Sequence, residues 1–180
     1  AGRKRRYTPC DGEATRQIGT LIDDAKGDPV TASSDPIIAS AREIFETALA
    51  DMRPAVEGAS PEALNWRPAA AKTNSIAVLA VHVMNSTRWW LSAATGAALP
   101  ARDRESEFVA TAADAGALLS IVDDLARDCE ALLDNAGQVD WRAKHRTSTR
   151  GRPDASDEVT AAFALIHAFG HLHEHIGQMM

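Results

Sequence analysis

Apolar residues in this sequence recur at the spacing of a helix over four long segments, and no segment alternates apolar and polar residues as a strand would. Such spacing places apolar side chains on one helix face. The first helix is predicted to begin at Ser34 or Asp35, with Pro36 in its first turn, and to end or kink at Pro54. Its inward face is expected to carry Ile37, Ala41, Ile44, Phe45, Ala48 and Met52.

The second helix has clear signals at both ends. It is predicted to begin at Asn74 or Ser75, both of which are common N-cap residues, and to stop at Gly96. Before it, the segment ASPEALNWRP (59–68) predicts a single capped turn. After it, ALPARDRESEF (98–108) is expected to be a polar connection.

The third and fourth helices follow in the C-terminal half. The third is predicted to begin at Thr111, which resembles a capping box with Asp114, and to end at Asn135. The segment QVDWRAKHRTSTRGRPDAS (138–156) is expected to be a long irregular loop. The fourth helix is predicted to be capped by Ser156 and to run to the end of the chain, with acidic residues favourably placed in its first turn, namely Asp157 and Glu158.

These four helices predict an all-α fold, a four-helix bundle with a long crossover connection. The chain of 180 residues suits one domain. We expect residues 34–180 to form the bundle. Residues 1–33 are expected to be an N-terminal tail that is partly disordered or contains one short helix over 11–26.

Charge and composition exclude several classes of function. The formal net charge of −6 argues against a general nucleic-acid-binding role. The chain lacks an apolar run of the roughly 18 residues that would span a bilayer, and its start lacks the apolar core of a secretory signal, so we expect a cytoplasmic protein without a membrane partner. Cys129 lies on an apolar helical stripe, where a cysteine usually acts as a small buried hydrophobe.

Histidines are concentrated at the end of the chain: four of the six lie in the last fourteen residues, HAFGHLHEHIGQMM. His171 and His175 are four residues apart, so both project from one face of the predicted helix and suit one metal ion. A third ligand should come from another helix, where His82 lies among apolar residues. A lone histidine there is otherwise a hydrogen-bonded core residue, but three buried histidines favour a shared ion.

For the other histidines and for Glu174, the sequence allows both a functional and a structural role. His167 is either a partner or substitute of the ligands or a residue of the polar face, and His173 is expected to be structural. His145, in the predicted loop, contacts substrate or is solvated. Glu174 is the candidate catalytic base, or else forms a solvated or interhelical ion pair.

Three segments resemble those of a known family. LNWRPAAAKTNSIAVLAVHV (64–83), VDW (139–141) and ALIHAFGHLHEHIGQMM (164–180) are similar to segments of the DinB-like superfamily of metal-binding four-helix bundles, over roughly residues 35–180. The resemblance implies that the ligands are His82, His171 and His175, and that the ion is zinc, nickel or a similar divalent metal. It also implies that homodimers are common and that some relatives are thiol transferases.

The leading functional hypothesis is therefore a metal-dependent S-transferase that joins a low-molecular-weight thiol to an electrophile, with the thiol activated at the three-histidine site. Two alternatives remain: a hydrolase that uses metal-bound hydroxide, and a non-enzymatic, stress-related metal-binding bundle. Whether the protein is an enzyme is left open.

Substrate-binding residues are expected in the basic loop and among the tryptophans. The loop before the last helix carries Arg142, Lys144, Arg146, Arg150 and Arg152. These residues either form a basic mouth for the carboxylates of a thiol or are solvated charges. An electrophile pocket would be lined by Trp89, Trp90 and Trp141, which are otherwise core or interface residues.

Overall fold

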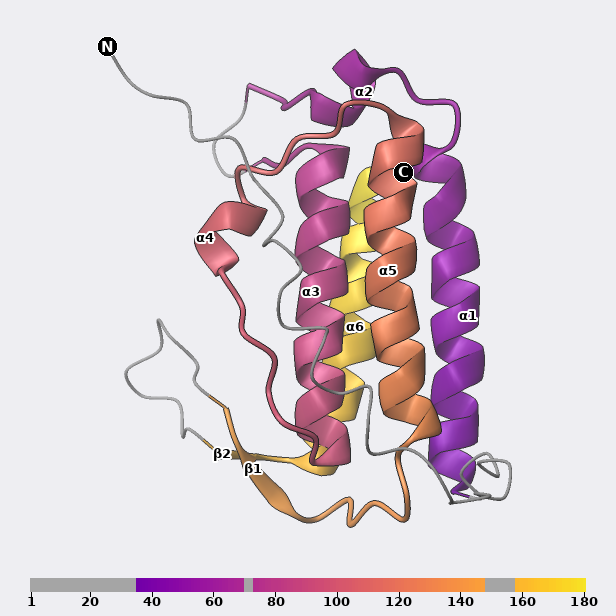
Figure 1. Ribbon diagram of the computed structural model, residues 1–180, viewed down its shortest axis with the longest axis vertical. Helices are drawn as coiled ribbons and strands as arrows, with labels where there is room; N and C mark the ends of the chain where they lie inside the picture. Colours follow the sequence, from indigo (N-terminus) through magenta and orange to yellow (C-terminus); the bar gives the residue numbers. More distant parts are fainter. Residues whose placement is uncertain (1–34, 70–72, 148–157) are drawn as a thin grey trace, which may run out of the picture. The chain divides into compact units, whose positions relative to one another are not determined.

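The computed structural model describes residues 35–69, 73–147 and 158–180. Within these residues four long helices form a bundle, as predicted, and the structure is all-α apart from one short pair of strands (Figure 1). The helices are α1 (Pro36–Val56), α3 (Ile76–Thr95), α5 (Ala115–Asp134) and α6 (Ala161–Met179). The predicted tail over 1–33, with its short helix at 11–26, lies outside the described residues.

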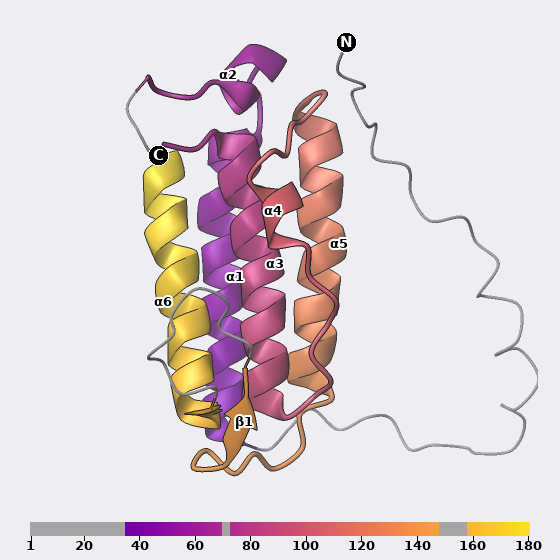
Figure 2. The ribbon, with the colours of Figure 1, turned by 90° about the vertical axis from the view of Figure 1, so that its left-hand side faces the viewer.

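The chain path includes a long crossover. Helix α3 packs against both α5 and α6, and α1 covers the other side of the same two helices (Figures 1 and 2). The connection after α3 climbs back along that helix before α5 begins, so α3 and α5 run in the same direction while α6 runs against them. The crossover contains one short helix, α4 (Arg104–Glu107), within the segment predicted to be a polar connection.

Local capping chemistry explains where α1 and α3 begin and end. The carboxylate of Asp35 accepts the backbone N–H of Ile37 at 2.8 Å, and the hydroxyl of Ser75 accepts that of Val78 at 3.3 Å. Gly96 ends α3 with a φ of 74°, a left-handed conformation that favours glycine. The predicted turn is present as α2 (Pro61–Asn65), with Ser60 as its cap.

The buried face of α1 differs from the predicted one. Ile37 and Ile44 are each 43 % exposed, and Ile38 is fully buried instead. The buried stripe follows helical spacing from Ile38, and a residue next to this stripe in sequence is rotated about 100° away from it. The helix also continues past Pro54 to Val56, because a proline in the last turn removes only one backbone hydrogen bond.

The predicted starts of α5 and α6 were wrong. Asp114 is itself the N-cap of α5, so the helix begins after Asp114 and not at Thr111. Helix α6 is capped by Thr160, because the preceding residues form strand β2 (Glu158–Thr160). This strand pairs antiparallel with β1 (Lys144–Arg146), inside the segment predicted to be an irregular loop. The predicted cap Ser156 lies outside the described residues.

The core lies between the four long helices and is made mostly of alanine and branched apolar side chains. Its largest fully buried members include Phe45, Met52, Met84, Leu118 and Leu172. Cys129 is also buried, as predicted, and burial raises the pKa of its thiol to about 12, so it does not act as a nucleophile near neutral pH. In the described part of the chain no helix combines the length and the apolar character needed to cross a bilayer.

Candidate metal centre

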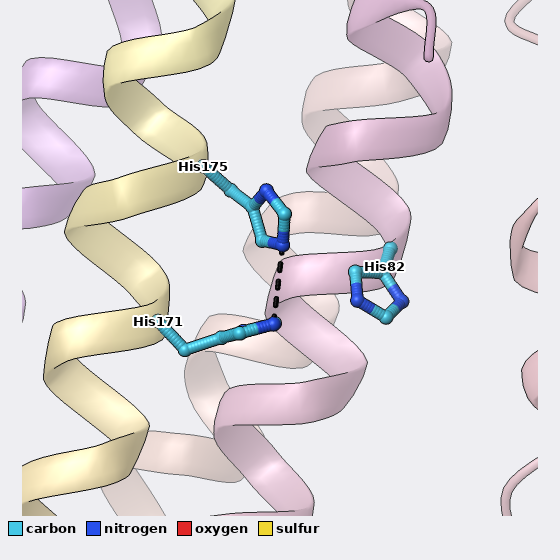
Figure 3. Close-up of side chains that lie close together, drawn as sticks. All are labelled: His82, His171 and His175. Carbon is cyan, nitrogen blue, oxygen red and sulfur yellow. Dashed lines mark hydrogen bonds between the residues drawn. The ribbon is translucent and has the colours of Figure 1, made fainter. Parts of the chain in front are cut away.

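Three histidine side chains from two helices converge in the bundle (Figure 3). His82 lies on α3 and is 4 % exposed. His171 and His175 lie one turn apart on α6 and are half-buried at the edge of the face that carries Leu172 and Ile176 into the core. Because α3 and α6 pack side by side, their buried faces bring the three imidazoles together.

The distances among the three rings are those of a compact cluster. The ring centroid of His82 lies 5.3 Å from that of His171 and 5.3 Å from that of His175. One nitrogen from each ring can be chosen so that all three lie within 4.8 Å of one another. The Nε2 atoms of His171 and His175 are 3.1 Å apart.

The donor set fits a divalent ion. The Nδ1 atom of His82 is hydrogen-bonded to Glu107 at 2.8 Å, and that of His175 to Gln178 at 2.9 Å, so Nε2 of each remains available to a ligand. Two nitrogens bound tetrahedrally to one zinc ion at about 2.0–2.1 Å lie about 3.3–3.4 Å apart, close to the separation seen between His171 and His175. The three histidines could therefore hold a metal ion.

The protonation state of His171 also suits a metal ligand. Burial, together with the neighbouring imidazoles of His175 and His82, lowers the pKa of His171 to about 3. A histidine must be neutral to donate a lone pair to a metal. His171 is neutral near neutral pH without losing a proton to the ion.

A buried ion pair stands behind His82 and was missed in the sequence. Glu107, the last residue of α4, is 3 % exposed and receives two hydrogen bonds from Arg102, at 2.7 and 2.8 Å. Burial raises the pKa of Glu107, but the hydrogen bonds from His82 and Arg102 outweigh this, and the pKa is lowered overall. The carboxylate is therefore ionised. Both residues lie in a run of charges that is typical of a solvated loop, so the sequence carries no signal that separates them from their neighbours.

The sequence model of the DinB superfamily matches residues 44–179, which include all three histidines and the Arg102–Glu107 pair. The chain belongs to the DinB superfamily. No curated protein matches the sequence. The family resemblance found in the sequence is thus confirmed, and this DinB chain has the three histidines together in space.

The other histidines of this DinB chain lie outside the cluster. His167 stacks on Phe163, with ring centroids 5.7 Å apart, and makes an edge contact with Trp90 at 4.4 Å. Burial lowers the pKa of His167. His173 is exposed, and its Nδ1 lies 2.9 Å from the carbonyl oxygen of Phe169. His145 lies on β1.

Of the predicted basic mouth, the structure describes only Arg142, Lys144 and Arg146. Arg142 and Arg146 are exposed, and Arg146 pairs in register with Glu158 at the end of the bundle where α6 begins. His171 lies eleven residues beyond Thr160, so the rise along α6 is about 16 Å. Arg150 and Arg152 lie outside the described residues. Within the described part of the chain, Arg102 is a positive group beside the cluster, with its Nη2 atom 3.5 Å from Nδ1 of His82.

The three tryptophans that were expected to line an electrophile pocket lie in different surroundings. Trp89 is 8 % exposed and contacts Trp90 edge-on, so it belongs to the packed interior. Trp141 donates its indole N–H to the carboxylate of Asp35 at 3.1 Å. Of the three, only Trp90 reaches the aromatic group of α6, through its contacts with His167 and Phe163.

A pocket adjoins the histidine cluster on the outer side of α6. It has a volume of about 300 Å³, and its lining residues are Phe163, Ile166, His167, Gly170, His171 and Glu174. Two of these are exposed apolar side chains, Phe163 at 51 % and Ile166 at 73 %. His171 belongs both to this pocket and to the histidine cluster, so a molecule bound in the pocket would lie beside the candidate metal position. Glu174 lies at the same pocket and is exposed.

Proposed function

We propose that this protein is a metal-dependent S-transferase, in which His82, His171 and His175 hold a zinc or nickel ion and a low-molecular-weight thiol attacks an electrophile. The observation that carries the proposal is the convergence of three imidazoles next to a partly apolar pocket. A divalent ion with an open coordination position lowers the pKa of a thiol that binds there, which raises the fraction of thiolate near neutral pH.

The residues of the chain supply binding and orientation. His171 is neutral near neutral pH because of its low pKa, so its lone pair is available without a preceding proton loss. His82 is buried while His171 and His175 are partly exposed, so small molecules approach the cluster from the α6 side. The α6 pocket suits the apolar part of an electrophile, with the aromatic rings of Phe163 and His167 available for stacking.

The overall reaction is a substitution at carbon. The thiol sulfur forms a bond to the electrophilic carbon, the leaving group departs with the electron pair of its bond, and the thiol proton passes to solvent. No oxidant or reductant is needed.

An assay with several low-molecular-weight thiols and a chloronitroarene tests this function. The metal-loaded protein is expected to accelerate thioether formation, and His171→Gln is expected to reduce the rate to that without enzyme, because one of three ligands is lost. His173→Gln is the matched control, since His173 is an exposed histidine on the same helix, and it should retain the activity. Equal rates for the wild type and His171→Gln would contradict the proposal.

The α6 pocket can be tested in the same assay with Gly170→Leu. A Cβ added at Gly170 would meet no atom within 4 Å, so a larger side chain should enter the pocket without displacing neighbouring residues. We expect a higher KM for the electrophile and an unchanged metal affinity.

The same preparation distinguishes the alternative functions. If the metal-loaded protein hydrolyses an ester without any thiol, the hydrolase alternative is favoured. If it is inactive with both substrate classes, a non-enzymatic role is favoured.

A further inference from the structure

The crossover connection brings a buried carboxylate against α3, the helix that carries His82. Glu107 and Arg102 lie five residues apart around α4, which lies alongside α3 in Figures 1 and 2. The side chain of Glu107 is 4 % exposed and that of Arg102 is 15 % exposed. A pair of charges this deeply buried must satisfy its hydrogen-bonding groups within the protein.

The carboxylate of Glu107 makes three hydrogen-bonding contacts with two partners. Its Oε1 atom accepts from Nε of Arg102 at 2.7 Å, and its Oε2 atom accepts from Nη2 of the same guanidinium at 2.8 Å. This two-point contact is the geometry in which arginine holds a carboxylate most firmly. The Nδ1 atom of His82 lies 2.8 Å from Oε2 and makes the third contact.

The chemistry of these partners decides which nitrogen of His82 carries hydrogen. A guanidinium can only donate, and a carboxylate that accepts two guanidinium hydrogens is ionised and can only accept. The Nδ1 atom of His82 must therefore be the donor. Nε2 then has no hydrogen, and its lone pair is directed at the cluster with His171 and His175. The separation of 3.5 Å between Arg102 Nη2 and His82 Nδ1 is that of two donors sharing one acceptor.

The structure therefore assigns Glu107, held in place by Arg102, as a positioning residue that keeps His82 in the Nδ1–H tautomer and so directs its Nε2 lone pair into the three-histidine cluster. The tautomer of a ligand histidine is set by the hydrogen bond of its other nitrogen, and such partners commonly change metal affinity about 10–100-fold when they are removed. The consequence for metal binding rests on the proposed function, whereas the assignment of the tautomer does not.

Long-range ¹H–¹⁵N NMR of the metal-free protein tests the assignment, because it distinguishes the two nitrogens of each imidazole. At about pH 8, well above the ordinary histidine pKa of about 6.5, His82 is expected to be in the Nδ1–H form in the wild type. Its signals are identified by their loss in His82→Gln. In Glu107→Ala we expect His82 to move toward the Nε2–H form that imidazole side chains prefer in water. Glu107→Gln keeps an acceptor oxygen and should largely retain the Nδ1–H form.

Glu105→Ala is the matched control, because Glu105 is an exposed glutamate on the same short helix and its removal should leave the tautomer unchanged. Zinc titrations are expected to show about 10–100-fold weaker binding in Glu107→Ala than in Glu105→Ala. An Nε2–H form of His82 in the wild type, or an unchanged Nδ1–H form in a folded Glu107→Ala, would overturn the assignment. Absence of zinc binding in the wild type would contradict the proposed function but would leave the tautomer result standing.

Discussion

Adding zinc to the metal-free protein is expected to raise its melting temperature by about 8–16 °C when free zinc is about a thousandfold above its dissociation constant. A ligand that binds only the folded form at that excess stabilises it by about 4.1 kcal/mol. In a domain of this size each kcal/mol shifts the midpoint by about 2–4 °C. Differential scanning calorimetry measures the shift, and a chelator should reverse it, because the three nitrogens are brought together only in the folded bundle.

Two substitutions show whether the shift comes from the three-histidine site. His82→Ala is expected to abolish it, because the remaining pair on α6 lacks the ligand from α3. His173→Ala should keep the full shift, since this exposed histidine lies outside the cluster. Equal zinc-induced shifts in the two variants would show that zinc binds elsewhere.

Leu172→Ala is expected to lower the free energy of unfolding by about 2–5 kcal/mol, because it leaves a cavity in the core. Leu172 has no exposed surface and lies between His171 and His175 in sequence, so its packing anchors the part of α6 that carries both histidines. Urea unfolding of the metal-free protein measures the loss.

Ile166→Ala is the matched control for this substitution. Ile166 is an apolar residue on the same helix but is 73 % exposed, so its replacement should change stability by less than about 0.5 kcal/mol. Similar losses in the two variants would mean that Leu172 is not part of the packed core as described.

The features of the fold that could be predicted from sequence are those that depend on nearby residues. Asp35 and Ser75 cap helices through their own backbone neighbours, and Gly96 ends a helix because it adopts a left-handed conformation. The start of α6 could not be found in this way. Strand β2 pairs with β1, which lies more than ten residues earlier in the sequence. Because of this long-range pairing the helix begins at Ala161, after the expected cap at Ser156.

In the candidate site too, the parts that depend on nearby residues could be predicted from the sequence, and the parts that depend on the tertiary path of the chain could not. Helical spacing predicts that His171 and His175 project from one face of α6. The apolar neighbours of His82 indicate that its side chain points inward. Glu107 meets His82 only because the crossover climbs back along α3, which depends on the tertiary path of the chain. Among the basic residues of the predicted mouth that the structure describes, Lys144 and Arg146 lie on β1, beside the start of α6 and away from the histidines, because β1 pairs with the strand that precedes α6.

A crystal structure of the zinc-loaded protein, with anomalous data collected at the zinc edge, tests the three-histidine site most directly. We expect one strong anomalous peak at about 2.0–2.1 Å from a ring nitrogen of each of His82, His171 and His175, with Glu107 still bonded to the other nitrogen of His82. A zinc-saturated crystal with no peak among these three rings, or with zinc bound only at other residues, would contradict this expectation.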